Sequence, residues 1–252
     1  MNNVNKKDRI KKIIKVVFVV AMIGMLAIFA ASCTWTVGFV RGSGDIKTEE
    51  REVSDFHKVH LSGVGNLIIT QGEEESLIIE ADDNIIPLIE TDVSGERLTI
   101  SFIRGYNFIP SANIKFYLTV IDLDEISLSG AGDIDCEDFR TESLEFEVSG
   151  AGDLNFDVNA ERIEVNSSGA ADLTLSGKAG SQDIEISGAG KYNGGELESR
   201  ECEITVSGAG SATVNVSEKL DVEIDGVGNV YYIGDPQVTQ DISGLGKIKS
   251  ID

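Results

Sequence analysis

The chain has 252 residues, with 43 acidic side chains against 21 basic ones, a formal net charge of −22 and 41% hydrophobic residues. Six of the basic side chains and one acid lie in the first 32 residues, so the part from Cys33 onward carries 15 basic against 42 acidic side chains. A body with that net charge of −27 repels nucleic-acid phosphates and anionic headgroups, so nucleic acid is not an expected partner. Three cysteines are too few for a disulfide scaffold, whereas the hydrophobic content is enough for a core.

The amino-terminal residues have the pattern of an export segment. A basic run at 6–15 precedes 17 uncharged residues, Val16 to Ser32, and this order places the amino end in the cytoplasm. Ala30-Ala31-Ser32-Cys33 resembles the bacterial lipobox, with Ala30 where the lipobox favours Leu. This resemblance implies that Cys33 is lipidated and becomes the new amino terminus.

An uncleaved signal anchor is the alternative, because the weakly polar stretch continues to Val40 and could span about 30 Å of hydrocarbon. Simple secretion is a third alternative. We therefore expect an export signal or membrane anchor over residues 1–32 and a tether over 33–44. The body is expected outside the cytoplasm, held at a membrane through a lipid or an amino-terminal helix.

One repeat dominates the body. A Ser-Gly-x-Gly pattern recurs at steps of 18 to 20 residues, and repeats of this kind indicate a stacked architecture. The copies begin at Ser129, Ser149, Ser168, Ser187, Ser207, Asp225 and Ser243, with one more at Ser62.

Apolar and polar residues alternate on both sides of each Gly pair, as in Phe146/Val148 before one pair and Leu154/Phe156 after it. This period of two indicates half-buried strands. Two or three short strands in about 19 residues form one rung of a β-solenoid, whose rungs stack about 4.8 Å apart. A propeller blade needs about 40 residues and fits this spacing badly. The prediction is an all-β solenoid with about 18–20 residues per rung.

The glycines of the repeat are expected at the corners of the rungs, where they permit positive φ and let neighbouring rungs approach without a Cβ clash. These corner glycines are Gly63, Gly65, Gly130, Gly132, Gly150, Gly152, Gly169, Gly188, Gly190, Gly208, Gly210, Gly226, Gly228, Gly244 and Gly246.

A single domain is predicted over residues 45–252, with irregular early rungs at 45–128 and regular repeats at 129–252. Solenoid ends need caps that protect the exposed strand edges. The irregular amino-terminal part and the polar stretch Lys247 to Asp252 are the candidates.

These residues also resemble a known family. Gly42-Ser43-Gly44-Asp45, Leu61 to Gly65 and Glu80 to Asn84 are similar to the head GIN domain, described as a putative auto-transporter adhesin of bacterial envelopes. The Ser-Gly-Ala-Gly-Asp repeats look like its second half, so the resemblance covers roughly residues 42–250. It implies a right-handed parallel β-helix-like fold, an exported and often lipoprotein location, and no catalytic residues.

Three aspartates follow the Gly pair in consecutive repeats, namely Asp133, Asp153 and Asp172. Carboxylates stacked in this way could be bridged by Ca²⁺. Aspartate at a turn is commonly only solvated, and Lys191 and Ser211 take the same position in the next two repeats. No cofactor is expected, and Ca²⁺ at these three aspartates is the open alternative.

The histidines and the body cysteines do not form a reactive set in the sequence. His57 and His60 would point to opposite faces of a strand, so a shared metal is not expected, and both are predicted at the surface or an edge. Cys136 and Cys202 lie three rungs apart in different phases, which is too far for a disulfide. Both thiols are predicted to be unpaired and buried.

An enzyme is not favoured. Polysaccharide-active β-helices need clustered carboxylates with an Arg or Lys, usually in a groove walled by long loops. Arg162 and Arg200 share a repeat phase, but residues 129–246 contain almost no insertions.

The sequence therefore predicts a membrane-tethered, extracytoplasmic β-solenoid that acts as a non-catalytic adhesion or envelope-interaction module. Its partner would be an envelope protein or a glycan, and self-association is open. The alternatives are a carbohydrate-binding or carbohydrate-active β-helix protein and an envelope-sensing component. Exposed aromatics would favour a glycan, but the repeats offer only Tyr192, Tyr231 and Tyr232, and Trp35 stands alone near the membrane.

Overall fold

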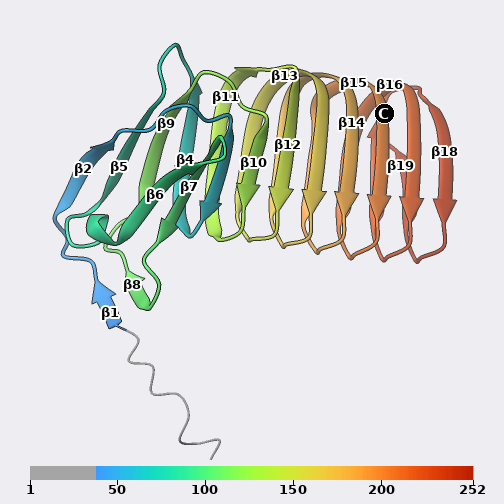
Figure 1. The fold of residues 1–252 in the computed structure, drawn as a ribbon. Helices are drawn as coiled ribbons and strands as arrows, with labels where there is room; N and C mark the ends of the chain where they lie inside the picture. Colours follow the sequence, from blue (N-terminus) through green and yellow to red (C-terminus); the bar gives the residue numbers. More distant parts are fainter. Residues whose placement is uncertain (1–37, 252) are drawn as a thin grey trace, which may run out of the picture. The chain divides into compact units, whose positions relative to one another are not determined.

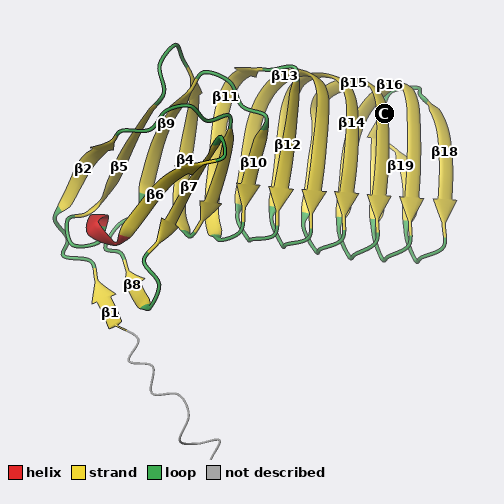
Figure 2. Cartoon of the chain, in the orientation of Figure 1, coloured by secondary structure: helices red, strands yellow, loops and turns green. Residues whose placement is uncertain are grey.

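The structure is a computed structural model that describes residues 38–251, and strands make up most of this range (Figures 1 and 2). The described residues divide into two units, residues 38–39 with 105–107, and residues 40–104 with 108–251. The second unit holds the solenoid and confirms the predicted all-β stack of rungs. The predicted export segment 1–32, Cys33 and Trp35 lie outside the described residues. Within residues 38–251 no helix is long and apolar enough to cross a membrane.

The strands are numbered as in Figure 1. They are β1 (Gly38–Arg41), β2 (Ile46–Arg51), β3 (Lys58–Ser62), β4 (Val64–Gln71), β5 (Ser76–Asp82), β6 (Ile89–Ser94), β7 (Arg97–Phe102), β8 (Tyr106–Ile109), β9 (Lys115–Val120), β10 (Glu125–Leu128), β11 (Ala131–Arg140), β12 (Ser143–Val148), β13 (Asp153–Ser167), β14 (Asp172–Ile186), β15 (Lys191–Val206), β16 (Ser211–Ile224), β17 (Asn229–Ile233), β18 (Gln237–Ile242) and β19 (Lys247–Ser250), with one 3-10 helix, η1 (Ile86–Leu88).

Parallel pairing builds the array, with register shifts in the pairs β11–β13, β14–β15 and β15–β16. The first half of β13 pairs with β11 and the second half with β12, so each long strand passes from one face of the solenoid to the other. We call the face made by β3, β7, β10, β12, β18 and the second halves of β13 to β16 the groove face, and the other the opposite face.

The core consists of apolar side chains stacked rung upon rung. One such stack joins Ile126, Phe146, Val165, Ile184, Ile204 and Val222 in register, and all six are at most 4% exposed. Burying a side chain of this size stabilises a fold by about 1.5–3 kcal/mol, so the continuous stack holds the rungs together.

The corner glycines are required mainly by the close approach of neighbouring rungs. A Cβ at Gly130 would lie 1.7 Å from the carbonyl oxygen of Gly63, and one at Gly150 would lie 2.2 Å from that of Gly130. Positive φ is the exception among the predicted corners and occurs at Gly65 and Gly152. Two reasons were predicted for glycine at the corners. Avoiding a Cβ clash between rungs is the general one, whereas positive φ applies only at Gly65 and Gly152.

The early part of the solenoid differs from a series of rungs in chain order. The pair β3 and β4 lies between β7 and β9 on one side and β10 and β11 on the other. The chain therefore runs outward from β4, builds a further rung with β7 and β9, and returns to continue the array at β10.

Antiparallel strands cover the outer side of that further rung. β6 pairs with β7, β5 pairs with β9, and β2 pairs with β5, all antiparallel. Residues 45–128 therefore form an antiparallel cap joined to rungs, and not only a set of irregular rungs. The 19-residue repeat gives no signal for this cap, because antiparallel strands do not follow its phase.

The carboxyl-terminal stretch is part of the last rung. Lys247 to Asp252 was a candidate cap, but β19 occupies Lys247–Ser250 and continues the parallel ladder on β17. β18 pairs with β16 in the same way. Within the described residues neither β18 nor β19 has a strand on its outer side.

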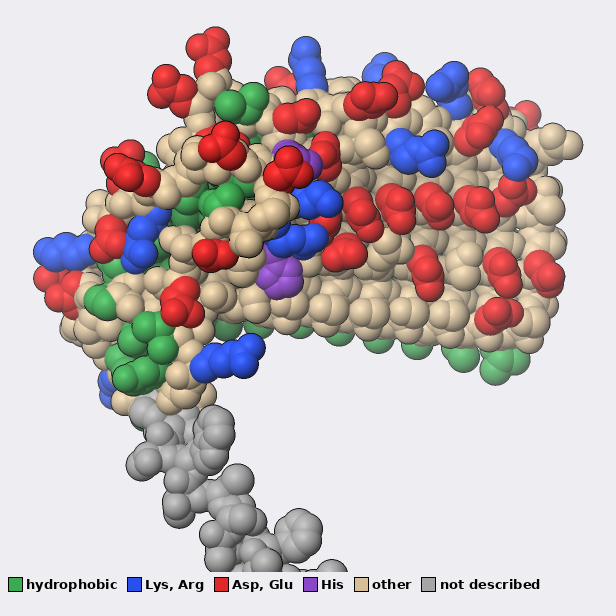
Figure 3. All heavy atoms as spheres, viewed as in Figure 1, with side chains coloured by type: hydrophobic (Ala, Val, Ile, Leu, Met, Phe, Trp, Pro, Cys, Tyr) green, Lys and Arg blue, Asp and Glu red, His purple; other side chains and the backbone are tan. Residues whose placement is uncertain are grey.

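An unbroken row of carboxylates runs along the groove face, and we call it the acidic ladder (Figure 3). The register aligns its members Glu125, Glu145, Glu164, Asp183, Glu203 and Asp221. Burial raises the pKa of the Glu145 carboxyl, and the neighbouring charges of Glu164, Glu147 and Glu125 raise it further. The Asn166 amide donates to both Glu145 and Glu164 at 3.2 Å, which offsets part of the repulsion.

Replacing a central member of this ladder should stabilise the protein. Like charges directly opposite on neighbouring strands are unfavourable by about 0.2–1 kcal/mol per pair, and Glu164 has an acid on each side. Glu164→Gln should therefore raise the melting temperature by about 2–4 °C at low ionic strength, and salt should reduce the gain. The control is Glu198→Gln, which instead removes an ion pair with Lys178 at 3.4 Å. Equal melting temperatures for both variants would contradict a repulsive ladder.

Candidate functional site

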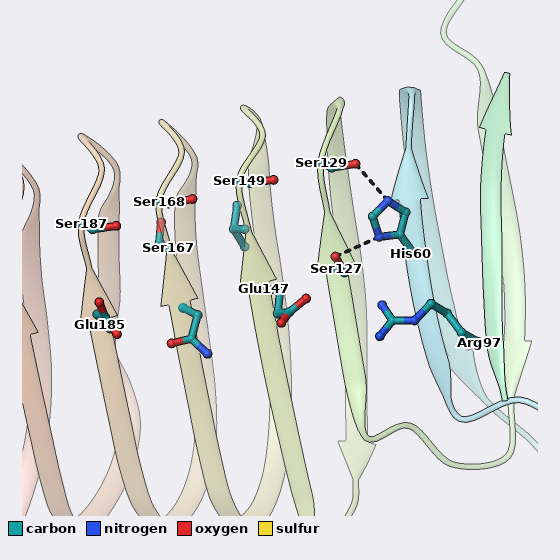
Figure 4. Close-up of a pocket in the computed structure, with 12 residues that line it drawn as sticks. His60, Arg97, Ser127, Ser129, Glu147, Ser149, Ser167, Ser168, Glu185 and Ser187 are labelled. Carbon is teal, nitrogen blue, oxygen red and sulfur yellow. Dashed lines mark hydrogen bonds between the residues drawn. The ribbon is translucent and has the colours of Figure 1, made fainter. Parts of the chain in front are cut away.

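A groove of about 550 Å³ lies on the groove face, where it crosses β3, β7, β10, β12, β13 and β14 (Figure 4). One row of lining residues is held in register across the strands and consists of His60, Ser127, Glu147, Asn166 and Glu185. A second row consists of the first residues of four repeats, Ser129, Ser149, Ser168 and Ser187. The repeat thus brings a hydroxyl, amide or carboxylate to the groove in each of these rungs.

His60 is half-buried and lies at one end of this groove. Its Nδ1 lies 3.0 Å from Ser127 Oγ and its Nε2 lies 2.9 Å from Ser129 Oγ (Figure 4). Burial lowers the pKa of His60, and the nearby charge of Arg97 lowers it further against the opposing effect of Glu125 and Glu147. The imidazole is therefore held neutral at pH 7, with one ring nitrogen donating and the other accepting.

A buried ion pair lies beside His60. Arg97 contacts both oxygens of Glu125, with Nη1 2.6 Å from Oε1 and Nη2 2.9 Å from Oε2. Glu125 is 5% exposed, and Lys58 Nζ lies 3.5 Å from its Oε2. One hydrogen bond, from Nη2 to Oε2, and the ion pair together hold the Arg97 side chain at the wall of the groove.

The arrangement supplies hydrogen-bonding groups more than reactive ones. The pair of His60 and Ser129 is within the reach of a nucleophile and its base. In a catalytic triad the second ring nitrogen is held by a carboxylate, whereas here it contacts the Ser127 hydroxyl. The groove is therefore suited to hold a polar ligand along several rungs.

The neutral state of His60 predicts a pH dependence of stability. Because its pKa is lowered in the folded state, the unfolded chain binds the proton more readily below pH 6.5. The free energy of unfolding should therefore fall as the pH drops below 6.5, and His60→Gln should remove that part of the fall. His57→Gln is the control, and this variant should still show the full fall in the free energy of unfolding below pH 6.5. Parallel curves for wild type and His60→Gln, in urea unfolding at several pH values, would contradict a neutral His60.

The three aspartates predicted as a calcium ladder lie on the opposite face. Asp153 aligns with Asp172, and Asp133 Oδ1 accepts a hydrogen bond of 3.2 Å from the Asp153 backbone N–H. Asp172 accepts one of the same length from Lys191 N and faces its Nζ at 3.7 Å. Among residues 38–251 no group of three or more His, Cys, Asp or Glu is placed to hold a metal. Calcium at these aspartates stays a prediction.

The body cysteines are buried and unpaired, as predicted. Burial raises the pKa of the Cys136 thiol to about 12 and that of Cys202 still higher, so neither is poised as a nucleophile. Tyr192, considered as an exposed aromatic, is only 2% exposed and donates its hydroxyl to Gln182 at 2.5 Å.

The two arginines that share a repeat phase are not aligned in space. Arg162 pairs with Ser181, which pairs with Glu201, so Arg200 lies one residue away from that row. Arg200 is 3.9 Å from Glu161 in an exposed ion pair. The arginine pair considered for a polysaccharide-active site therefore does not form.

Comparison with known proteins agrees with the fold. The family model described as "Putative auto-transporter adhesin, head GIN domain" matches residues 55–236. A putative adhesin from Bacteroides fragilis is 28% identical with a TM-score of 0.80, and the match covers 84% of this chain and 100% of that one.

Two further solved structures share the fold. A putative lipid binding protein from Parabacteroides distasonis is 19% identical with a TM-score of 0.70, covering 85% of this chain and 100% of its own. A putative adhesin from Parabacteroides merdae is 20% identical with a TM-score of 0.65 and the same coverage. A search of curated proteins gives no match. Because the family model spans most of the solenoid, this chain belongs to the family described as putative auto-transporter adhesins with the head GIN domain.

Proposed function

We propose that the chain is a non-catalytic adhesion module that is tethered to the outer side of a bacterial membrane. The observation that carries this proposal is the groove, in which side chains from successive rungs present hydrogen-bonding groups at one repeated spacing. A surface of this kind makes many weak contacts in parallel, which is the way multivalent binding gains strength. The His60 ring, held between two hydroxyls, supports binding over bond cleavage.

The tether is proposed to be a lipid on Cys33. The basic run followed by an uncharged stretch supports export, and membership of an adhesin family supports an envelope location. Cys33→Ser should release the protein from the membrane fraction or block its processing. Unchanged gel mobility together with membrane retention would contradict lipidation and favour an uncleaved anchor.

A glycan is the second candidate for the ligand class of this surface. The groove offers serine hydroxyls, the Asn166 amide and two carboxylates, which are groups that bind sugar hydroxyls. No Phe, Tyr or Trp is among its lining residues in the described chain, so stacking of a sugar ring on such a side chain would not contribute there.

The test is a binding screen of the full chain in detergent against a glycan array and against envelope extracts, with and without Ca²⁺. The proposal expects a ligand whose binding is weakened at least tenfold by Glu147→Lys in the groove. The matched control Glu198→Lys, at an exposed position outside the groove, should bind as wild type does. Binding to envelope extract without glycan binding would exclude the glycan. No binding to either would overturn the adhesion proposal.

A further inference from the structure

The two ends of the solenoid are built differently. At the amino-terminal end the antiparallel strands β2, β5 and β6 extend the sheets beyond the last parallel rung, whereas at the other end the parallel rung of β18 and β19 has no described strand beyond it (Figure 1). Open strand edges pair readily with another chain, and proteins normally protect them. Among the described residues, the outer edge of this parallel rung is therefore available to a partner.

The open end exposes groups that every inner rung buries. Val238 and Ile248 are half-buried, whereas Leu220 and Val230, in the same positions one rung earlier, are 0% exposed. Ile242 is 38% exposed. A further rung placed on this end would complete the apolar stack.

The backbone of β18 is also unsatisfied on its outer side. Ile224 accepts a hydrogen bond of 3.1 Å from Ser243 N, so its carbonyl points toward the last rung. Ile242 occupies the equivalent position in that rung, and Gln240 lies two residues before it on the same strand. Because alternate residues of a strand direct their polar groups to opposite neighbours, the groups of Gln240 and Ile242 point away from the array.

The charges of the last rung suit a second copy of the same chain. The acidic ladder ends at Asp221, and the neutral Thr239 takes its place in β18, so two such ends can meet without opposing ladders. β19 carries Lys247 and Lys249 on its outer surface, and β18 carries Asp241. In a two-fold arrangement β18 of each copy lies antiparallel to β19 of the other, which brings each Asp241 to lysines of the second copy.

We propose that the chain forms a two-fold, end-to-end dimer through its carboxyl-terminal rung, joined by β18 and β19 of each copy. A two-fold contact of this kind is closed, so it joins the two carboxyl-terminal rungs and does not repeat into an open series. The β-sheets of the two solenoids become continuous across the contact.

The dimer also suggests which partner the adhesion module binds, and this step rests on the proposed function. The chain enters the solenoid at the capped end, where Gly44 N donates to Asp82 Oδ1 at 2.8 Å and Ser43 N donates to Asn84 Oδ1 at 3.0 Å. End-to-end pairing places these two points at opposite ends of the dimer. Two tethered copies would then join most directly when they come from facing membranes, so the partner is a second copy on another cell.

The interface is tested with the full chain in detergent, by light scattering after size-exclusion chromatography. We expect a dimer that dissociates on dilution. Gln240→Pro removes an outward N–H without breaking a bond to β16 and should leave a monomer, whereas the matched Gln240→Ala should remain a dimer. Circular dichroism melting checks that both variants are folded.

A charge exchange tests the same contact without a proline. Lys247→Glu with Lys249→Glu should raise the dissociation constant at least tenfold, and adding Asp241→Lys should restore part of the affinity. A monomer at every concentration, a dimer that persists in the folded Gln240→Pro variant, or an open series of larger assemblies would each overturn the proposal.

The facing-cell assignment has its own readout. Two differently labelled cell populations that both display the chain should co-aggregate, and Gln240→Pro in either population should abolish this. A dimer in detergent without co-aggregation would overturn the facing-cell assignment but not the interface. The groove screen is repeated with the Gln240→Pro variant. If this variant binds the ligand as wild type does, the groove and the dimer interface act separately, so a failure of the interface proposal is distinguished from a failure of the adhesion proposal.

Discussion

Gly130→Ala should lower the free energy of unfolding by about 3 kcal/mol, which corresponds to a fall in melting temperature of roughly 6–12 °C. The added Cβ would lie 1.7 Å from the carbonyl oxygen of Gly63 and 2.5 Å from its nitrogen. Both are backbone atoms of the corner that follows β3, and the Gly63 carbonyl accepts a hydrogen bond of 2.7 Å from Ala131 N in the next rung, so relief requires the rungs to separate. Thermal melting of the full chain followed by circular dichroism measures the effect.

The matched control for this substitution is Gly195→Ala within β15. A Cβ at Gly195 would find its nearest neighbour, Thr213 Cγ2, at 3.5 Å, which is an ordinary van der Waals contact. Its melting temperature should stay close to that of wild type. If Gly130→Ala and Gly195→Ala lowered the melting temperature equally, the close spacing of the rungs could not be the reason that the corners require glycine.

Asp82→Ala should have the largest effect of any single carboxylate replacement in the cap. Asp82 is 0% exposed and accepts hydrogen bonds from Gly44 N at 2.8 Å, Ser111 N at 2.8 Å and Ser111 Oγ at 2.5 Å. Removing the carboxylate leaves these donors without their acceptor, at a cost of about 3 kcal/mol. Hydrogen exchange should increase at Gly44 and Ser111 in particular.

The control lies next to it in the chain. Asp83 is exposed and accepts one hydrogen bond, from Ser43 Oγ at 2.6 Å, so Asp83→Ala should cost less than about 1 kcal/mol. A cost at Asp83 equal to that at Asp82 would contradict the assignment of Asp82 as the residue that fixes the incoming chain.

The stabilising effect of Asp82 should depend on pH in a defined direction. Burial raises the pKa of this carboxyl, but the hydrogen bonds from Ser111 and Gly44 outweigh burial and hold the pKa below 3.8. Stability from a group with a lowered pKa is complete above the unfolded value and is lost as the pH falls through the folded one. The difference between wild type and Asp82→Ala should therefore shrink below about pH 3.8.

The regular half of the fold could be predicted from sequence because parallel stacking aligns residues that share a repeat phase. The 18–20 residue step and the alternating apolar positions were enough to predict the rungs, their core and their glycine corners. The cap could not be predicted in this way, since β2, β5 and β6 pair antiparallel and share no phase with the repeat. The hairpin of β6 and β7 turns through Gly95 and Glu96, both with positive φ, and glutamate there gives little turn signal.

Part of the candidate site was present in the repeat and was missed. Each member of the acidic ladder lies four residues before the first residue of its repeat, as Glu125 does before Ser129. Each residue of the groove-lining row that contains His60 lies two residues before the first residue of its repeat, as His60 does before Ser62. Aligning the repeats by phase would have shown both rows, but not that His60 contacts hydroxyls of the next rung, because that depends on how β3 stacks on β10.

The most direct test of the account is the force needed to separate single cells. A cell that displays the full chain is brought against a second such cell or against a surface coated with envelope extract, and the rupture force is recorded. If the chain is a tethered adhesin, specific rupture events disappear when the chain is deleted and become rare when Cys33→Ser removes the tether. Equal forces for cells with and without the chain would contradict an adhesive role.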